Sequence, residues 1–288
     1  MIKSVGHTLL KWELNNSRVF LNSIFDFIFP RFCPACNNKL SINENVICSN
    51  CISSIKLLQN DFLQKEYQKK FANDNFITDF QSLFIFEKEK ELQKIIHALK
   101  YENKVYIGKF LGSLLAQELF NELKKWNVDF IIPIPLHSLK KAQRGFNQSY
   151  YIAKGISRVL KIPVENSVIK RNRFTESQTK KSAVERRTNV EGAFSVRNAT
   201  KVENKKIILV DDVITTGATI SECARILKFS GAKNIYAVSI AIPDDYILSG
   251  ADTPNIDKPF FNTIWVATAS EILASARFFS LPIILHSV

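Results

Sequence analysis

The stretch KKIILVDDVITTGATISECARIL, residues 205–227, joins a strand, a loop and a helix within one short segment. The apolar run before its two acids predicts a buried strand, and the apolar residues after position 219 have the spacing of one helix face. Asp211 and Asp212 end the strand, and a hydroxyl-rich turn separates them from the helix. This strand–loop–helix order is the unit from which parallel sheets covered by helices are built.

The loop in this stretch combines two kinds of ligand-binding group. The start of a helix offers unpaired backbone N–H groups that suit a phosphate, and Gly217 lets the backbone approach such a ligand closely. The carboxylates of Asp211 and Asp212 would repel phosphate, but they suit sugar hydroxyls or a hydrated Mg²⁺. The pattern therefore indicates a site for a phosphorylated ribose. The alternative is a strand that ends in a capped turn, for which Asp and Thr are ordinary residues.

Outward from this stretch, strands alternate with helices. The strands are expected at 82–86, 128–134, 164–169, 206–211 and 234–242. The helices are expected at 87–101, 107–125, 148–160 and 219–230, and a helix followed by a connector at 52–75. The alternation predicts the α/β class, with a parallel sheet flanked by helices. In such sheets ligands bind beyond the carboxyl ends of the strands. Both IPIPLH, residues 132–137, and LVDDVITTGAT, residues 209–219, lie at such ends.

The N-terminal part of the chain contains four cysteines in the pattern C-x2-C-x11-C-x2-C. They are Cys33, Cys36, Cys48 and Cys51. Two short knuckles that each present two thiolates close a tetrahedral site, which predicts bound zinc. A site with four cysteine ligands leaves no open position, so the ion is expected to be structural. A redox pair or unligated thiols are the alternatives.

The positive charge of the chain is concentrated in its middle. Residues 138–206 contain 17 Lys and Arg against 5 Glu and no Asp, an excess that equals the formal charge of +12 for the whole chain. Such a concentration favours polyanions, either the phosphates of a small ligand or a nucleic acid, although a solvated basic face without a partner is the alternative. The chain shows no export signal and no transmembrane run, so we expect a cytoplasmic protein. A peripheral position at the inner face of the membrane stays open, because the apolar segment 19–29 predicts an amphipathic helix.

The stretch around the two acids resembles the phosphoribosyl pyrophosphate (PRPP) signature of type I phosphoribosyltransferases. Together with IIPIPLHSLKKAQRGFNQS, RNRFTESQTKKSAVERRTNVEGAF and the four-cysteine segment, it resembles the ComF family of competence-associated proteins. The resemblance runs from about Phe29 to Ile242. It implies a type I phosphoribosyltransferase fold with a small zinc-ribbon segment, Mg²⁺ bound with PRPP, and a role in bringing DNA into the cytoplasm.

The resemblance also implies roles for individual residues. The ribose and Mg²⁺ would be held by Asp211 and Asp212. The 5′-phosphate would be held by Thr215, Thr216, Gly217, Ala218 and Thr219. The pyrophosphate loop would contain His137, Lys140, Lys141, Arg144 and Gly145. A mobile hood over the ligand would contain Arg173, Gln178, Arg186 and Arg187.

The chain is expected to divide into five parts. These are an amphipathic helix at 1–29, the zinc-binding segment at 30–55, a connector at 56–80, the phosphoribosyltransferase-like domain at 81–243, and an atypical tail at 244–288. Three functions fit this organisation. The first is a DNA-uptake protein that binds PRPP and acts on or with incoming single-stranded DNA through its basic region, together with proteins of the uptake machinery. The second is an enzyme that transfers ribose 5-phosphate from PRPP to an unidentified nitrogen acceptor. The third is a PRPP sensor that acts through a protein partner.

Overall fold

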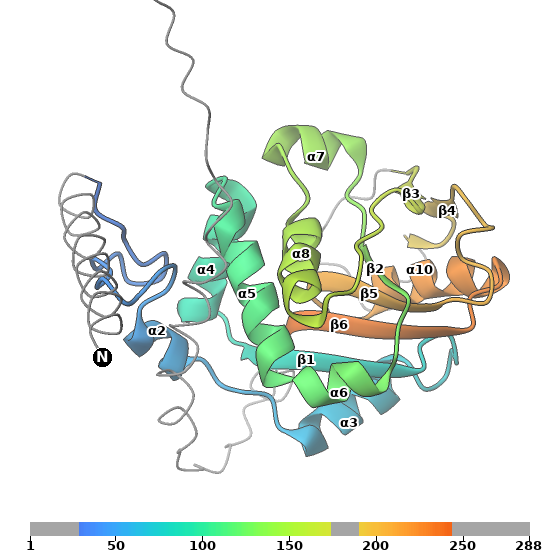
Figure 1. Ribbon diagram of the computed structural model, residues 1–288, viewed down its shortest axis with the longest axis horizontal. Coiled ribbons are helices and arrows are strands. Elements are labelled where there is room, and N and C mark those ends of the chain that lie inside the picture. The colour runs from blue at the N-terminus through green and yellow to red at the C-terminus, as the bar shows by residue number, and fades with distance from the viewer. Residues whose placement is uncertain (1–28, 174–189, 244–288) are drawn as a thin grey trace, which may run out of the picture.

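Four parallel strands form the centre of the protein. A computed structural model describes residues 29–173 and 190–243, and Figure 1 shows their arrangement. The strands are β1 (Asp79–Phe86), β2 (Phe130–Pro133), β5 (Lys206–Val213) and β6 (Asn234–Pro243). Their order in the sheet is β1-β6-β5-β2, and every neighbouring pair is parallel. The predicted α/β class with a parallel sheet is therefore confirmed.

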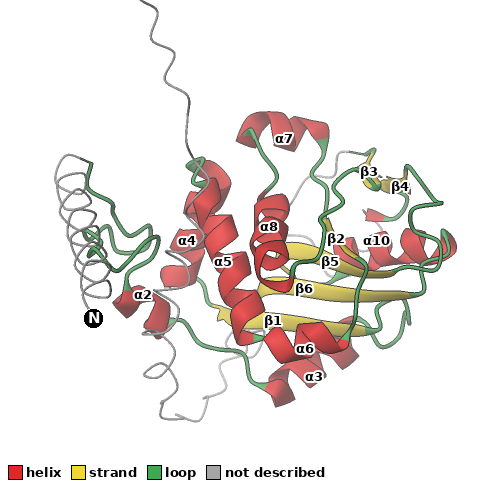
Figure 2. Cartoon of the chain, viewed as in Figure 1, coloured by secondary structure: helices red, strands yellow, loops and turns green. Residues whose placement is uncertain are grey.

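Helices cover both faces of this sheet (Figure 2). The described helices are α2 (Ser49–Ser54), α3 (Asn60–Lys70), α4 (Glu91–Tyr101), α5 (Val105–Glu118), α6 (Phe120–Lys125), α7 (Ser138–Arg144), α8 (Gln148–Leu160) and α10 (Ala218–Phe229). Alternate residues of β5 belong to different cores, because successive side chains of a strand point to opposite faces. Ile208 and Val210 pack in the layer with α4, α5 and α8, whereas Ile207 and Leu209 pack in the layer with α3 and α10.

Two of these helices approach each other unusually closely. A Cβ atom at Gly112 of α5 would lie 2.1 Å from the carbonyl oxygen of Ile152 in α8. A Cβ atom at Gly155 of α8 would lie 2.2 Å from the carbonyl oxygen of Lys109 in α5. Since no side chain fits at either position, the glycines set the distance between the helices. They thereby fix where α8 begins relative to the end of β5.

Most predicted elements are confirmed, and helix 148–160 coincides with α8. The single helix expected over 107–125 is instead two helices, α5 and α6, which meet at Leu119. The strand expected at 164–169 is wrong. Val164 forms only one parallel bridge with Ile131 of β2. The next residues, 166 and 167, are Asn and Ser, which are typical of turns, and the chain leaves the sheet there.

A second, two-stranded sheet lies beside the main one. β3 (Ile169–Arg171) pairs with β4 (Phe194–Val196) in an antiparallel arrangement. The sequence pattern did not predict this hairpin, because each strand is only three residues long. It brackets the segment 174–189, which lies outside the described residues together with 1–28 and 244–288. The expected N-terminal helix and the C-terminal tail therefore lie outside the described part of the chain.

The segment expected to be a connector has structure of its own. The backbone N–H of Leu58 donates to the carbonyl of Leu83 (2.9 Å), and that of Ile85 donates to the carbonyl of Lys56 (3.0 Å). Residues 56–58 therefore cover the open edge of β1. A covered edge cannot pair with a strand of another chain. After them, α3 buries Leu63 in the same core layer as α10.

Among the described residues, none of the helices combines the length and the apolar character needed to cross a membrane.

Candidate functional site

Two neighbouring carboxylates lie at the carboxyl edge of the parallel sheet, at the end of β5. Asp211 is half-buried and Asp212 is only 5% exposed. The hydroxyl of Ser149, near the start of α8, donates to Oδ1 of Asp211 (2.9 Å). Because the glycine contact holds α8 against α5, the packing of two helices determines the surroundings of this carboxylate.

The second carboxylate has a different partner. The ammonium of Lys100, in the last turn of α4, forms an ion pair with Oδ2 of Asp212. The side chain of Lys100 is 23% exposed and that of Asp212 is 7% exposed. A cation from α4 thus contacts one member of the acidic pair.

The pKa values of the two carboxyl groups are shifted in opposite directions. Burial, together with the charge of Asp212, raises the pKa of Asp211 to about 7. Burial alone would raise the pKa of Asp212 as well, but the Lys100 ammonium holds it below its usual value. The pKa of Lys100 is raised because the attraction of Asp212 outweighs the effect of burial. Asp212 is therefore the permanently charged member of the pair, and Asp211 can change its charge when a ligand binds.

The loop between β5 and α10 presents small and hydroxyl-bearing residues at the same edge. Thr215 is exposed, Thr216 and Thr219 are half-buried, and α10 begins at Ala218 after Gly217. Gly217 has a φ of 77°, and its close neighbour is Phe71 at the end of α3, since a Cβ atom would lie 2.8 Å from Cε1 of that ring. The loop is therefore open to solvent on the threonine side and supported by α3 on the other.

The residues expected in a pyrophosphate loop form a short helix instead, α7. Nδ1 of His137 accepts a hydrogen bond from the N–H of Leu139 (3.3 Å) and caps this helix. Gly145 ends the helix with a φ of 78°. Lys141 is exposed and Lys140 is half-buried. The segment between β2 and α8 thus contains a short helix that the sequence pattern did not predict, and it follows β2 at the carboxyl edge of the sheet.

Arg144, the last residue of α7, connects this helix to two others. Its guanidinium donates to Oε1 of Gln148 in α8 (3.1 Å) and to the hydroxyl of Tyr101 in α4 (3.4 Å). It also stacks on the ring of Tyr101, with Cζ 5.2 Å from the ring centre. Arg144 therefore joins the expected pyrophosphate segment to α4 and α8.

Of the expected hood residues, only Arg173 lies within the described part of the chain. It donates to the carbonyl of Glu191 (2.8 Å) and so closes the base of the segment whose other members, Gln178, Arg186 and Arg187, lie outside the described residues. Across the base, Glu222 of α10 accepts the N–H of Gly192 (2.9 Å). The structure thus describes where the hood region is attached.

Sequence reasoning missed three residues around the acid pair: Lys100, Ser149 and Arg171. Arg171 stacks on Phe194 across the small hairpin, with Cζ 5.1 Å from the ring centre. Burial lowers the pKa of Arg171, and the charge of Asp211 opposes this shift. A signal for Lys100 was present, because it lies four residues after Ile96 and continues the buried face of α4. No sequence signal distinguishes Ser149 from an ordinary residue at the start of a helix.

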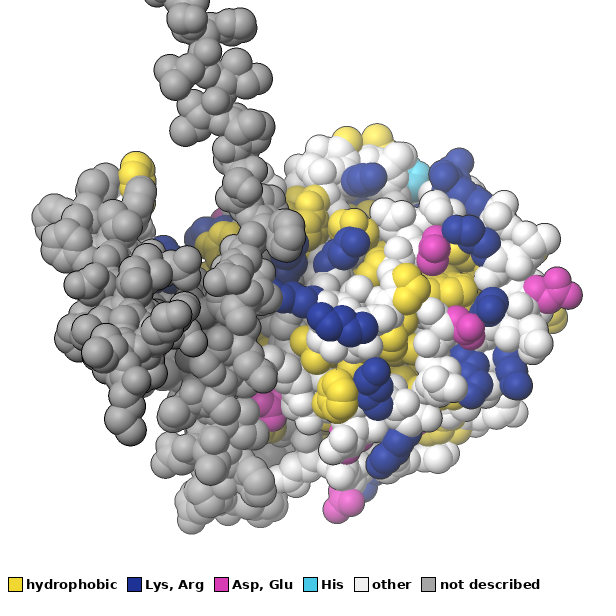
Figure 3. Space-filling view, viewed as in Figure 1, with side chains coloured by type: hydrophobic (Ala, Val, Ile, Leu, Met, Phe, Trp, Pro, Cys, Tyr) yellow, Lys and Arg dark blue, Asp and Glu magenta, His cyan; other side chains and the backbone are white. Residues whose placement is uncertain are grey.

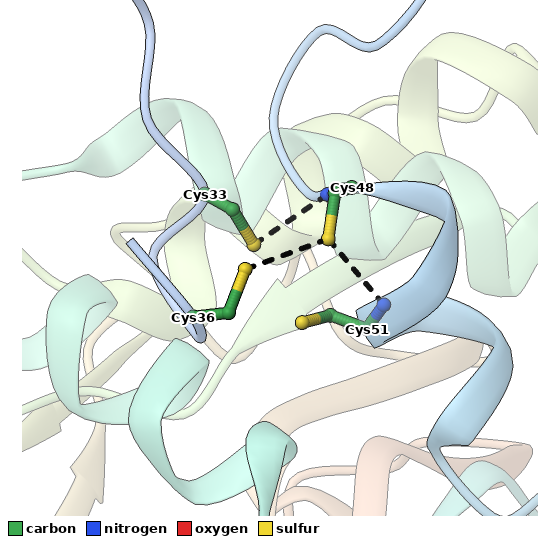
Figure 4. A group of neighbouring side chains, drawn as sticks. All are labelled: Cys33, Cys36, Cys48 and Cys51. Atoms are coloured by element: carbon green, nitrogen blue, oxygen red, sulfur yellow. Dashed lines mark hydrogen bonds between the residues drawn. The ribbon is translucent and has the colours of Figure 1, made fainter. Parts of the chain in front are cut away.

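The four cysteines converge at the other end of the molecule from the β3–β4 hairpin (Figures 1 and 4). Their Sγ atoms all lie within 4.8 Å of one another, and those of Cys36 and Cys48 are 3.7 Å apart. Zinc–sulfur bonds of about 2.3 Å in a regular tetrahedron would separate sulfurs by ~3.8 Å. The geometry therefore fits a metal ion.

Backbone N–H groups point at two of these sulfurs. The N–H of Cys48 donates to Sγ of Cys33 (3.5 Å), and the N–H of Cys51 donates to Sγ of Cys48 (3.4 Å). Burial alone would raise the pKa of Cys33, but such N–H groups lower it to about 7. Burial and the neighbouring thiols raise the pKa of Cys48 and Cys51. Because the thiolate is the form that binds metals, Cys33 is the member of the cluster that most readily offers a thiolate at neutral pH.

Comparison with known proteins identifies the family of the chain. The model of the phosphoribosyl transferase domain matches residues 111–266, which is more than half of the chain and extends past the expected domain end at 243. Competence protein F of Haemophilus influenzae is 28% identical over 219 residues, which cover 73% of this chain and 96% of that protein. Competence protein ComFC of Bacillus subtilis is 28% identical over 204 residues, 69% of this chain and 72% of that protein. DNA utilization protein YhgH of Escherichia coli O157:H7 is 35% identical over 147 residues, 50% of this chain and 64% of that protein. The chain therefore belongs to the phosphoribosyl transferase domain family and, within it, to the ComF family of competence-related proteins.

Proposed function

We propose that this chain binds PRPP together with Mg²⁺ and acts on or with incoming single-stranded DNA in the cytoplasm. One observation carries the proposal: the two carboxylates at the end of β5 are followed directly by an open threonine loop and the start of α10. Hydroxyl-binding and phosphate-binding groups therefore lie at one sheet edge, about a loop length apart. A sugar phosphorylated at its 5′ position carries both of the groups that these residues suit, hydroxyls and a phosphate.

In this proposal each part of the site binds a different part of PRPP. The loop 215–219 binds the 5′-phosphate, and Asp211 and Asp212 bind the ribose hydroxyls. We assign the pyrophosphate to the cations of α7, Lys140, Lys141 and Arg144, because charged donors bind a strongly negative group best. Mg²⁺ prefers carboxylate and phosphate oxygens, so Asp211 and the pyrophosphate would hold it, and it would neutralise charge that develops on the pyrophosphate.

Calorimetric titration of PRPP, with and without Mg²⁺, tests this assignment on wild type and Asp211→Asn. The structure makes Asp211→Asn the better variant, since Asp212→Asn would leave the Lys100 ammonium without its partner. We expect the variant to lose about 10-fold or more in affinity, as for the loss of a hydrogen bond to a charged group. Asp61→Asn, an exposed carboxylate at the start of α3, is the matched control. Equal affinity of Asp211→Asn and wild type would remove the carboxylate from the site.

We also propose that the metal of the four-cysteine segment is zinc and that it is structural. Four thiolates complete a tetrahedron, so no position remains for a substrate. The proposed division of the chain keeps this segment at 30–55, and a protein partner or the DNA-uptake machinery could bind there without contact with the sheet edge.

Binding of single-stranded DNA rests on the charge of residues 138–206. Exposed cations of this region include Lys141, Lys154, Lys161, Lys170 and Lys201. Figure 3 shows Lys and Arg side chains spread over the described part of one face rather than gathered in one patch. Affinity for an oligonucleotide should then fall steeply as salt is raised, with a slope of about −0.7 per phosphate contacted. Binding that is weak at low salt or indifferent to salt would exclude this role.

Turnover of PRPP separates the two remaining candidates. An enzyme that transfers ribose 5-phosphate to a nitrogen acceptor releases pyrophosphate, whereas a sensor that acts through a protein partner binds PRPP without consuming it. A pyrophosphate-release assay with PRPP, Mg²⁺ and a panel of nitrogenous bases, amines and single-stranded DNA distinguishes them. Release that depends on one acceptor and is lost in Asp211→Asn would identify the enzyme.

A further inference from the structure

Helix α4 contributes to the candidate site although it lies before the region that defines the domain. The domain model begins at residue 111, whereas α4 ends at Tyr101. Its last turn nevertheless brings the Lys100 ammonium to Asp212 and the Tyr101 ring to Arg144. Two consecutive residues of one helix therefore contact the acid pair and the α7 segment.

The arrangement of charges at this end of α4 suits an anionic ligand. Lys100 and Arg144 lie close enough for their charges to repel, since Arg144 opposes the raised pKa of Lys100. Like charges that are brought together by packing are costly unless a counter-charge lies between them. Asp212 supplies one negative charge next to Lys100, whereas Arg144 contacts only neutral groups, Gln148 and Tyr101, in its described hydrogen bonds.

The Lys100 side chain can reach both the protein and a ligand. An ammonium has three donors, and the ion pair with Asp212 uses one of them. The side chain is 23% exposed at an edge of the sheet where Thr215 and Lys141 are also exposed, so a ligand oxygen can approach the ammonium without breaking that ion pair.

We propose that Lys100 is a ligand-binding residue of the PRPP site, whose ammonium bridges Asp212 and an oxygen of the pyrophosphate. This inference rests on the proposed function, because it assigns a further residue to the same ligand. A bridge of this kind would place the pyrophosphate near both Lys100 and Arg144. The other possible role of Lys100 is that of a structural counter-ion, which affects the ligand only through Asp212.

The two roles differ in which ligand they affect. Ribose 5-phosphate has the hydroxyls and the 5′-phosphate of PRPP but lacks the pyrophosphate. If Lys100 holds the pyrophosphate, Lys100→Met should weaken PRPP binding about 10- to 100-fold and ribose 5-phosphate binding by less than about 3-fold. A counter-ion alone would weaken both ligands equally, because both use the Asp212 carboxylate.

Calorimetry on the full chain measures the affinity for both ligands, and their ratio is the preference for PRPP. Where ribose 5-phosphate binds weakly, its affinity is measured by competition against PRPP. Lys94→Met, an exposed lysine of the same helix, is the matched control. Lys100→Arg should recover most of the preference for PRPP, since it restores the positive charge. If Lys100→Met fails to fold, the pair Asp212→Asn and Asp212→Asn/Lys100→Met replaces it. The single variant should keep the preference for PRPP and the double variant should lose it.

Three outcomes would overturn the inference. Unchanged PRPP affinity in Lys100→Met, or an equal loss for both ligands, would exclude contact with pyrophosphate while leaving the proposed function intact. Failure of wild type to bind PRPP at all would instead remove the proposed function and this inference with it.

Discussion

Asp211 and Asp212 are adjacent in the chain, yet different helices of the same core layer supply their partners. Asp211 meets a hydroxyl of α8, and Asp212 meets an ammonium of α4. Burial acts on both, but only Asp212 has a cation to offset it, and their pKa values therefore move apart. Two identical side chains thus obtain different charge states from their neighbours.

Gly217→Ala tests how tightly the threonine loop is supported. The new Cβ would lie 2.8 Å from the Phe71 ring at a φ of 77°. We expect a loss of about 1–3 kcal/mol in the free energy of unfolding, from backbone strain and steric overlap together. Urea unfolding measures it. Gly192→Ala, at a φ of 68° with nothing within 4 Å, isolates the backbone part, so an equal loss in both variants would contradict the packing role.

Glu44 is expected to order the loop between the two cysteine knuckles. Its carboxylate accepts the N–H of Ser49 (2.6 Å) and the N–H of Ser41 (3.0 Å), and these bonds lower its pKa to about 2. Since the folded pKa lies below the ordinary value, the stabilisation is fully present above pH ~4.5 and is lost as the pH falls toward 2. Glu44→Gln should therefore weaken zinc binding at pH 7, roughly 3- to 10-fold, in a chelator competition. Glu89→Gln, outside the segment, should leave it unchanged.

Helix α3 supports the site from the second core layer. Glu66 and Lys70 form an ion pair within it, and each residue is 4% exposed. The Cβ of Lys70 also lies 3.4 Å from the position that a Cβ on Gly217 would take. The helix that follows the zinc segment therefore touches the loop expected to hold phosphate.

Glu66→Gln should destabilise the protein by about 3–5 kcal/mol, because it leaves a buried ammonium without its counter-charge. The double variant Glu66→Leu/Lys70→Met should recover much of this loss, since it removes both charges. Chemical denaturation of the single and double variants gives the comparison. Lys65→Gln, exposed on the same helix, serves as the control. A double variant that is less stable than Glu66→Gln would show that the pair itself is strongly stabilising.

The sequence predicted long elements with a clear apolar period better than short ones. Helix α8 was predicted with its observed ends, because Asn147 caps it and its apolar face repeats over several turns. Strands β3 and β4 were missed, since three residues are too few to show a period. Helix α7 was expected as a loop because its short sequence buries no residue and so has no apolar face.

At the scale of the whole molecule, the four-cysteine segment shares a core with the domain. Its buried residues, Leu40, Ile47 and Ile52 among them, pack in the same cluster as α4, α5 and α8. Loss of the metal should therefore destabilise the domain as well as the segment.

Calorimetric unfolding with and without a zinc chelator checks this expectation. We expect a lower transition temperature for the domain after chelation, and the same for Cys36→Ser, which removes one exposed ligand. Cys223→Ala should keep one metal ion per chain, since Cys223 is buried in the other core layer. A domain transition that is unaffected by chelation would mean that the segment folds independently.

The sequence by itself determined the α/β class, the parallel strands, the four-cysteine cluster and the carboxylate–threonine loop, because each depends on residues that are close together in the chain. Only the tertiary structure decided which groups surround the acid pair. Lys100, Ser149 and Asp211 come from three separate elements, and their contacts depend on helix packing through Gly112 and Gly155 and on strand order. Such contacts join residues that are far apart along the chain, so no local pattern records them.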